Sequence, residues 1–184
     1  MEKVNYNRLM ILFSNIHNLP IFSIREGVSI GQIEEIIINP DNGRVLGFKL
    51  IKTHVRERNI LTVGDIREIN PDVMIIDDSQ NLATENEVIK IAEILKEKIK
   101  WIGLKVETDL GRKLGRVEDL ALDTKTMNLT RIYTSGGIIK ETFSLEKIII
   151  PAHKIISISP KVVIVEDDYI KTKAAKQVSA TETA

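Results

Sequence analysis

The chain has 184 residues, 43% of them apolar and 4% aromatic, and its 26 Lys and Arg residues balance 26 Asp and Glu residues. A protein that binds nucleic acid usually carries an excess of basic residues, so this balance disfavours nucleic acid as the main partner. A neutral chain can still carry a local basic patch. The lack of cysteine excludes disulfides, thiolate nucleophiles and zinc–thiolate sites. The core must be aliphatic, mainly Ile and Val, and β-branched residues favour a mostly β fold.

The N-terminal segment carries one short apolar run, from Leu9 to Phe13. A membrane-spanning helix needs about 20 apolar residues, and no small-residue cleavage site follows the run. We therefore expect no membrane span and a soluble, cytoplasmic protein. Residues 1–19 are predicted to be an N-terminal lead-in, a strand or turn that packs on the unit following it.

An internal repeat organises most of the chain. Gly31 aligns with Gly115 at an offset of 84 residues, which places residues 26–39 over residues 110–123. Apolar positions, two glycines and an acidic pair coincide in order along this alignment. Such agreement is hard to obtain by chance, so the sequence predicts one small unit present twice.

The second copy is longer than the first. Pro71 aligns with Pro160 at an offset of 89, so five residues have been gained. Insertions belong in loops and hairpin tips, and the extra residues fall around Ser135-Gly136-Gly137. Residues 20–80 and 101–170 are the two predicted domains.

Each copy is predicted to consist of short strands separated by turns. The cluster Asn39-Pro40-Asp41-Asn42-Gly43 should close a hairpin, because Pro presets φ while Asn and Gly tolerate positive φ. Gly31 and Gly115 predict a bend or bulge in the long second strand, with a short helix as the alternative. The predicted strands cover residues 21–24, 30–39, 44–52, 59–63, 66–69 and 72–77, and then 104–107, 114–122, 129–133, 138–150, 154–158 and 161–166.

One helix is predicted between the copies, within a linker of residues 81–100. Thr84 and Glu87 form a capping box that would start it, and apolar residues then follow helical spacing to residue 99. Its apolar stripe, including Ile91 and Leu95, should be buried across one barrel or the seam between the two. The fold class is therefore mostly β, two tandem small β-barrels joined by one amphipathic α-helix, followed by a disordered tail at residues 171–184.

The segment Gly27–Phe48 resembles the PRC-barrel family, named after the cytoplasmic domain of the photosynthetic reaction-centre H subunit and also found in a maturation factor of the small ribosomal subunit. The family signature, G-x-x-[IL]-G-x-[IV]-x-[DE], is matched closely by Gly111–Asp119 and nearly as well by Gly27–Glu35. The resemblance covers residues 20–78 and 102–168. It implies small β-barrels that serve binding or assembly, with no family-wide enzymatic activity.

The sequence predicts no catalytic, cofactor or metal site. His17, His54 and His153 are too scattered for a metal-ligand spacing, and each is expected at the surface or in a turn. Asp77-Asp78 and Asp167-Asp168 follow the last strand of each copy. We interpret these pairs as solvated strand ends, with a cation site as the alternative.

Other polar residues receive structural interpretations. Glu34-Glu35 and Glu118-Asp119 are expected to be strand-edge residues, and acid–base chemistry is the weaker interpretation. Ser135-Gly136-Gly137 is expected to be a hairpin tip, because neither a helix nor a Lys-Ser/Thr pair follows it. Trp101 should anchor the second core. A modest basic cluster is expected to be a solvated face, with an RNA contact as the alternative; it comprises Lys105, Arg112, Lys113 and Arg116.

These observations favour a non-enzymatic binding or assembly module whose partner is a protein or a second copy of the chain. The alternative is an RNA- or ribosome-associated maturation factor, and an enzyme has the least support. Because two linked contacts raise the effective concentration at a shared partner, the working surface is expected to be common to both copies and bounded by the linker.

Overall fold

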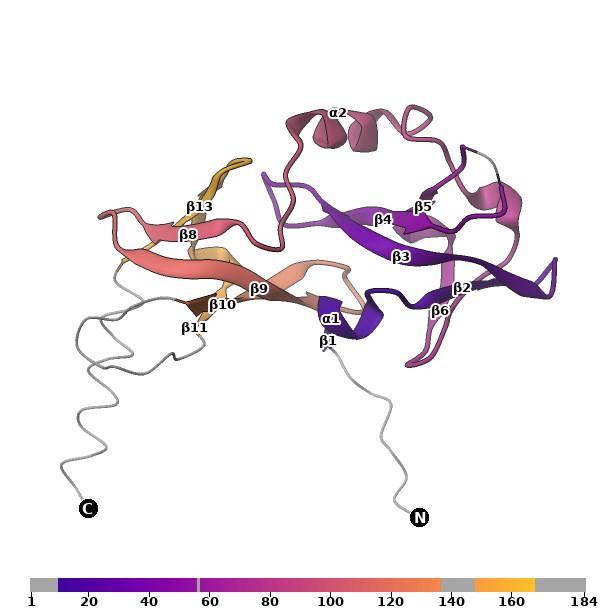
Figure 1. Ribbon diagram of the computed structural model, residues 1–184, viewed down its shortest axis with the longest axis horizontal. Coiled ribbons are helices and arrows are strands. Elements are labelled where there is room, and N and C mark those ends of the chain that lie inside the picture. Colours follow the sequence, from indigo (N-terminus) through magenta and orange to yellow (C-terminus); the bar gives the residue numbers. More distant parts are fainter. Residues whose placement is uncertain (1–9, 56, 137–147, 168–184) are drawn as a thin grey trace, which may run out of the picture.

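The computed structural model describes residues 10–55, 57–136 and 148–167. The chain is mostly β, as predicted, and its strands form two sheets (Figure 1). The elements are β1 (Met10–Leu12), α1 (Phe13–Ile16), β2 (Pro20–Ser23), β3 (Val28–Ile38), β4 (Val45–Ile51), β5 (Ile60–Thr62), η1 (Val63–Asp65), β6 (Ile66–Ile69), β7 (Met74–Ile76), η2 (Ser79–Asn81), α2 (Ile89–Glu97), β8 (Lys105–Thr108), β9 (Lys113–Asp123), β10 (Leu129–Gly136), β11 (Ile148–Pro151), η3 (Ala152–Lys154), β12 (Ile155–Ile158) and β13 (Val162–Val165).

The two sheets share one strand order. The first runs β5-β4-β3-β2-β7-β6 and the second runs β11-β10-β9-β8-β13-β12, so each strand of one order has a counterpart at the same place in the other. β1 lies outside these orders and pairs with β9. The β2–β7 and β8–β13 pairs are both parallel, while the other neighbours within each order are antiparallel. We refer to these sheets, with their connections, as the first and second units.

The long strands β3 and β9 carry the predicted irregularity. The pairing of β2 with β3 shifts by one residue at Ile30, and the pairing of β8 with β9 shifts at Leu114. Each extra residue lies beside the shared glycine, Gly31 or Gly115, and Gly115 has a φ of +99° that other residues rarely adopt. The bulge is therefore confirmed, and the helical alternative is wrong.

The prediction of closed barrels is wrong. Each sheet order has two free ends, and within the described residues β5 does not pair with β6, nor β11 with β12. A single 3-10 turn, η1 or η3, joins the two end strands in each unit. The two strands joined by this turn therefore lie at opposite ends of the strand order of their sheet.

The helix α2 starts later than predicted. The Glu87 carboxylate accepts a hydrogen bond from the Thr84 amide at 2.7 Å, as a capping box requires, but these residues close a turn and α2 begins at Ile89. Its end is set by Lys98, which adopts the left-handed conformation. Ile91 is buried as predicted, whereas Leu95 is half-buried and Ile94 takes the second buried position.

The helix covers the outer face of the first unit alone. Ile91 and Ile94 pack with Ile37 of β3 and Ile60 of β5 in a small cluster separate from the main core. At the offset of 84, the second unit has Ala121 where the first has Ile37. The smaller side chain leaves less apolar surface on that outer face for a helix to cover.

The N-terminal lead-in packs on the second unit, contrary to the prediction. β1 pairs antiparallel with β9, with Met10 opposite Asp123 and Leu12 opposite Ala121, and α1 follows directly against the same strand. Phe13 and Ile16 of α1 are buried. The chain then crosses the seam and enters the first unit at β2 (Figure 1).

The two units are joined by two equivalent backbone hydrogen bonds, one donated by each unit. The Val45 amide donates to the Met127 carbonyl and the Leu129 amide donates to the Gly43 carbonyl, both at 2.8 Å. At the offset of 84, Val45 corresponds to Leu129 and Gly43 to Met127, so each hairpin tip makes the same bond to the other. A reciprocal contact of this kind is what a two-fold axis generates in a homodimer, and here it relates two halves of one chain.

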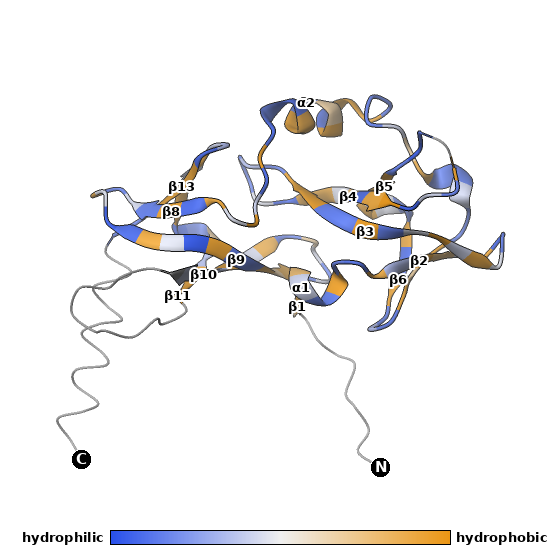
Figure 2. Cartoon of the chain, viewed as in Figure 1, coloured by the Kyte–Doolittle hydropathy of each residue, from blue (hydrophilic) through white to orange (hydrophobic). Residues whose placement is uncertain are grey.

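A single main core runs through both units. Figure 2 shows hydrophobic and hydrophilic stretches alternating along β3 and β9, as expected of strands with one buried face. The buried residues Phe48 and Met74 of the first unit belong to the same contact cluster as Leu120 and Ile132 of the second. The units are therefore expected to unfold together rather than as separate domains.

One buried hydroxyl in this core yields a prediction. The Thr134 side chain on β10 is fully buried, and its Oγ1 has no hydrogen-bond partner, whereas Leu50 stands at the equivalent position of β4. Replacing Thr134 by the isosteric Val should raise the free energy of unfolding by about 1 kcal/mol, because the hydroxyl is desolvated without compensation. Urea denaturation would measure the change.

A second buried threonine provides the matched control. The Thr108 side chain is 2% exposed, and its Oγ1 accepts a hydrogen bond from the Arg112 amide at 3.1 Å. Thr108→Val should therefore lower the free energy of unfolding by about 1 kcal/mol. If both substitutions shift it in the same direction, hydrogen bonding does not account for the effect.

Candidate functional site

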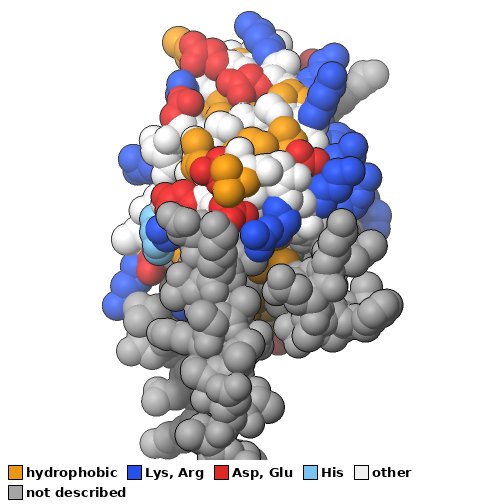
Figure 3. All heavy atoms as spheres, turned by 90° about the vertical axis from the view of Figure 1, so that its left-hand side faces the viewer, with side chains coloured by type: hydrophobic (Ala, Val, Ile, Leu, Met, Phe, Trp, Pro, Cys, Tyr) orange, Lys and Arg blue, Asp and Glu red, His pale blue; other side chains and the backbone are white. Residues whose placement is uncertain are grey.

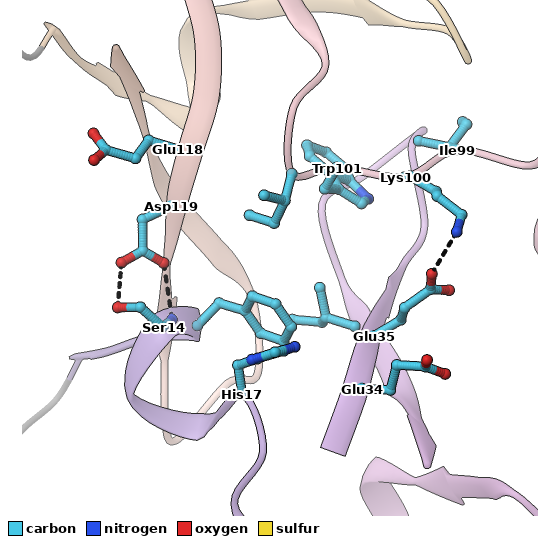
Figure 4. A pocket seen from close by; sticks show the side chains of 12 residues that line it. Ser14, His17, Glu34, Glu35, Ile99, Lys100, Trp101, Glu118 and Asp119 are labelled. Atoms are coloured by element: carbon cyan, nitrogen blue, oxygen red, sulfur yellow. Dashed lines mark hydrogen bonds and ion pairs between the residues drawn. The ribbon is translucent and has the colours of Figure 1, made fainter. Parts of the chain in front are cut away.

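A cavity of about 470 Å3 lies at the seam, and both units contribute to its walls (Figure 4). β3 provides one side and β9 the other, while α1 and the segment between α2 and β8 complete it. The lining residues are Phe13, Ser14, His17, Glu34, Glu35, Ile36, Ile99, Lys100, Trp101, Ile102, Glu118 and Asp119. Residues of both units therefore line one concave surface.

Four carboxylates line this cavity as two equivalent pairs. Glu34 and Glu35 extend from β3, and Glu118 and Asp119 extend from β9 on the opposite side (Figure 4). The register of β3 with β4 shifts at Glu34, and that of β9 with β10 shifts at Glu118. A bulge breaks the alternation of side chains, which is how two consecutive residues come to line the same cavity.

Two crossing contacts hold the walls together. From the lead-in, the Ser14 amide and hydroxyl donate to the two oxygens of the Asp119 carboxylate at 3.0 and 2.5 Å. From the linker, Lys100 Nζ lies 3.0 Å from Glu35 Oε1. The lead-in therefore contacts the acidic pair of the second unit before the chain enters the first unit. The segment before β8 likewise contacts the acidic pair of the first unit before the chain enters the second.

The floor of the cavity is apolar. Trp101 is 3% exposed and Ile36 7%, whereas Ile102 is 44% exposed. Trp101 is buried as predicted, and its position in the cavity wall is an additional finding. The His17 ring packs edge-on against Phe13, with ring centroids 5.7 Å apart.

The chemistry of this arrangement suits binding. The lining residues include four carboxylates and one ammonium group, so the cavity is acidic although the chain as a whole is neutral. The Ser14 hydroxyl donates to the Asp119 carboxylate, and His17 Nδ1 lies 2.9 Å from the side-chain Nδ2 of Asn18. Ser14 and His17 therefore do not form a nucleophile–base pair with each other. An apolar floor with anionic sides matches a ligand that is apolar along its length and cationic at its end.

The two aspartates after β7, Asp77 and Asp78, form ion pairs with different arginines. Arg67 Nη1 lies 2.6 Å from Asp77 Oδ1, while Asp78 pairs with Arg25 and also accepts a hydrogen bond from the Gln80 amide at 2.8 Å. Among the described residues, no group of three or more His, Asp or Glu side chains is placed to hold a metal ion. The cation alternative gains no support here.

The equivalent pair of the second unit differs from the prediction of a solvated strand end. The Asp167 side chain is 3% exposed and lies 3.4 Å from Arg112 Nη2. Its backbone amide donates to Asp109 Oδ1 at 3.0 Å. Asp168 lies outside the described residues.

The basic cluster is partly engaged in contacts within the second unit. Arg112 contacts Asp167, and Arg116 Nη1 donates to the Gly103 carbonyl at 2.8 Å. Lys105 lies opposite Arg116 in the β8–β9 pair, and Lys113 is exposed. Figure 3 shows basic side chains gathered mainly along one side of this end of the molecule, with acidic ones across the rest of the described surface.

The remaining candidates lie apart from the cavity. His54 is exposed in the loop after β4, and His153 is exposed in η3. Ser135 and Gly136 belong to β10, opposite Arg116 and Gly115 of β9, so they are not a hairpin tip. Gly137 and most of the predicted strand 138–150 lie outside the described residues, and residues 148–150 begin β11.

Sequence comparison supports the family resemblance for the first unit. The model of the PRC-barrel domain matches residues 9–82, which include the second half of the lead-in and every strand from β1 to β7. No curated protein matches the chain. None of the helices that the structure describes is long and apolar enough to cross a membrane.

Proposed function

We propose that this chain, whose residues 9–82 are a PRC-barrel domain, is a non-enzymatic module that binds a protein partner through the cavity at its seam. The observation that carries the proposal is the composition of that cavity, because equivalent residues of both units line it. A partner seated there would contact both units at once, and the second contact would then be intramolecular.

The second unit is proposed to be a second PRC-barrel, so that the chain is a tandem pair. Its strand order corresponds to that of the first unit strand by strand, and the signature Gly111–Asp119 aligns with Gly27–Glu35. α2 serves in this view as the linker between the two. The reciprocal hydrogen bonds between the hairpin tips suit two copies of a unit that once paired with itself.

The RNA-associated alternative is less well supported. Arg112 and Arg116, the two guanidinium groups of the basic cluster, contact Asp167 and the Gly103 carbonyl. Guanidinium groups engaged within the protein are less available for phosphate. The cavity itself is acidic and would repel a phosphate backbone.

The test compares two exposed isoleucines. Ile102 lines the cavity and is 44% exposed, while Ile156 on β12 is 54% exposed and lies away from the cavity. A partner captured from lysate by the parent chain, then purified, should bind the Ile156→Arg variant with unchanged affinity. The Ile102→Arg variant should lose binding by roughly tenfold or more, because the new side chain fills the cavity mouth. Equal affinity for both variants would place the working surface elsewhere.

A further inference from the structure

We infer that the group received by the cavity is a Lys or Arg side chain, presented by the partner protein between aliphatic neighbours. This inference rests on the proposed function and specifies the chemistry of the partner. The stem of that side chain would lie on the Trp101 and Ile102 side of the cavity. Its cationic end would lie on the β3 side of the cavity, beside the Glu34 carboxylate (Figure 4).

Charge complementarity is the first argument. Asp119 is held by Ser14 and Glu35 by Lys100, so these two carboxylates are fixed in position by the crossing contacts. Glu34 is half-buried at the cavity wall and belongs to none of the ion pairs among the described residues. Lys49 is the cation that its charge acts on, and the Lys49 ammonium pairs with Glu85 at 2.8 Å instead. A half-buried carboxylate in an acidic cavity gains more from a cation than a fully solvated one does, because water screens it less.

The shape and polarity of the cavity are the second argument. Its volume of about 470 Å3 exceeds what a bound metal ion needs, and it lies within the roughly 300 to 1,000 Å3 typical of ligand sites. The exposed Ile102 and the buried Trp101 offer an apolar surface beside the carboxylates. Lys and Arg side chains combine an aliphatic stem with a charged end, and aliphatic neighbours in the partner would cover the exposed isoleucine.

The experiment uses the full chain and four acetylated, amidated nonapeptides. They share Ile at positions 4 and 6 and Gly or Ser elsewhere, and they carry Lys, Arg, norleucine or Glu at position 5. Trp101 is the single tryptophan of the chain, so its fluorescence reports occupancy of the cavity directly. The Lys and Arg peptides should bind at least roughly tenfold more tightly than the norleucine peptide, and more weakly at high salt. The Glu peptide should not bind.

Matched variants locate the binding. Glu34→Gln should lower the affinity for the Lys peptide roughly tenfold. Glu97→Gln alters an exposed carboxylate of α2 outside the cavity and should leave this affinity unchanged. Norleucine binding as tightly as Lys would overturn the inference, because charge would then not be recognised. Binding of the Lys peptide that is insensitive to both Glu34→Gln and Ile102→Arg would also overturn it.

The inference and the proposed function fail in different ways. If no peptide changes Trp101 fluorescence while Ile102→Arg still abolishes capture of the partner, the inference that the cavity receives a Lys or Arg side chain is wrong. The proposed function, binding of a protein partner at the cavity, would then still hold. If Ile102→Arg leaves the partner bound, the proposed function fails, and with it the inference. Concentration-dependent dimerisation that Ile102→Arg abolishes would identify a second copy as the occupant, and this too would overturn the inference.

Discussion

Replacing Ile91 by Asp is expected to lower the free energy of unfolding by about 3 to 5 kcal/mol, the scale for an uncompensated charge in an apolar core. Ile91 is 1% exposed and packs with Ile37 and Ile60 on the outer face of the first unit. Both strands of that face also contribute to the main core from their other side. A charge at Ile91 is therefore expected to detach α2 from this face.

The neighbouring Ile89 provides the control. It belongs to the same helix but is 76% exposed, so Ile89→Asp should change the free energy of unfolding by no more than about 0.5 kcal/mol. Thermal and urea unfolding of the two variants, followed by circular dichroism, would measure the difference. Similar losses in both variants would indicate that helix propensity is responsible and that α2 is not packed.

Local residue types account for the parts of the fold that the sequence predicts well. The strand predicted at residues 66–69 is β6, and the predictions around residues 30–39 and 114–122 agree with β3 and β9 to within two residues at each end. The long strands β3 and β9 follow Gly27 and Gly111 and are rich in aliphatic residues, so residue types near each strand predict it even though its bulges break the regular alternation. The change of offset from 84 to 89 holds in the structure, because Gly47 pairs with Thr62 and Arg131 with Pro151. The five residues are therefore gained between β10 and β11, after the predicted Ser135 and Gly136 positions, which belong to β10.

The candidate site depends on features that no single segment encodes. Glu34 and Glu118 line one cavity only because each is the extra residue of a bulge, and the sequence shows this as nothing more than a repeated acidic pair. The recurrence of that acidic pair in both copies is the only feature of the sequence that points to this site. The shift in pairing is set by the partner strands β4 and β10, whose register lies outside the motif.

The course of the lead-in is a second feature that local chemistry leaves open. The run from Leu9 to Phe13 predicts a short apolar strand but not the sheet that receives it. The choice follows from the reciprocal arrangement of the units, in which the lead-in contacts the acidic pair of β9 and the linker contacts that of β3. Expressing residues 1–82 or 100–184 alone would remove both crossing contacts and expose part of a shared core, so separated halves do not test the binding site cleanly.

Phe13→Ala measures how strongly the crossing lead-in is anchored. Phe13 is 5% exposed, belongs to the main core and also lines the cavity. Its truncation should lower the free energy of unfolding by about 3 to 5 kcal/mol, as is usual for a buried phenylalanine. The loss should appear as one cooperative shift of the whole urea transition, because the lead-in joins the core of both units.

Met10→Ala is the matched control within the same segment. Met10 is 40% exposed at the start of β1, so its truncation should cost about 0.5 kcal/mol or less. If Phe13→Ala is as mild as Met10→Ala, the lead-in lies on the surface without supporting the seam. If instead Phe13→Ala splits the transition into two steps, the units are separate cooperative domains, and a cavity that requires both of them to be held in place would lose its rigid frame.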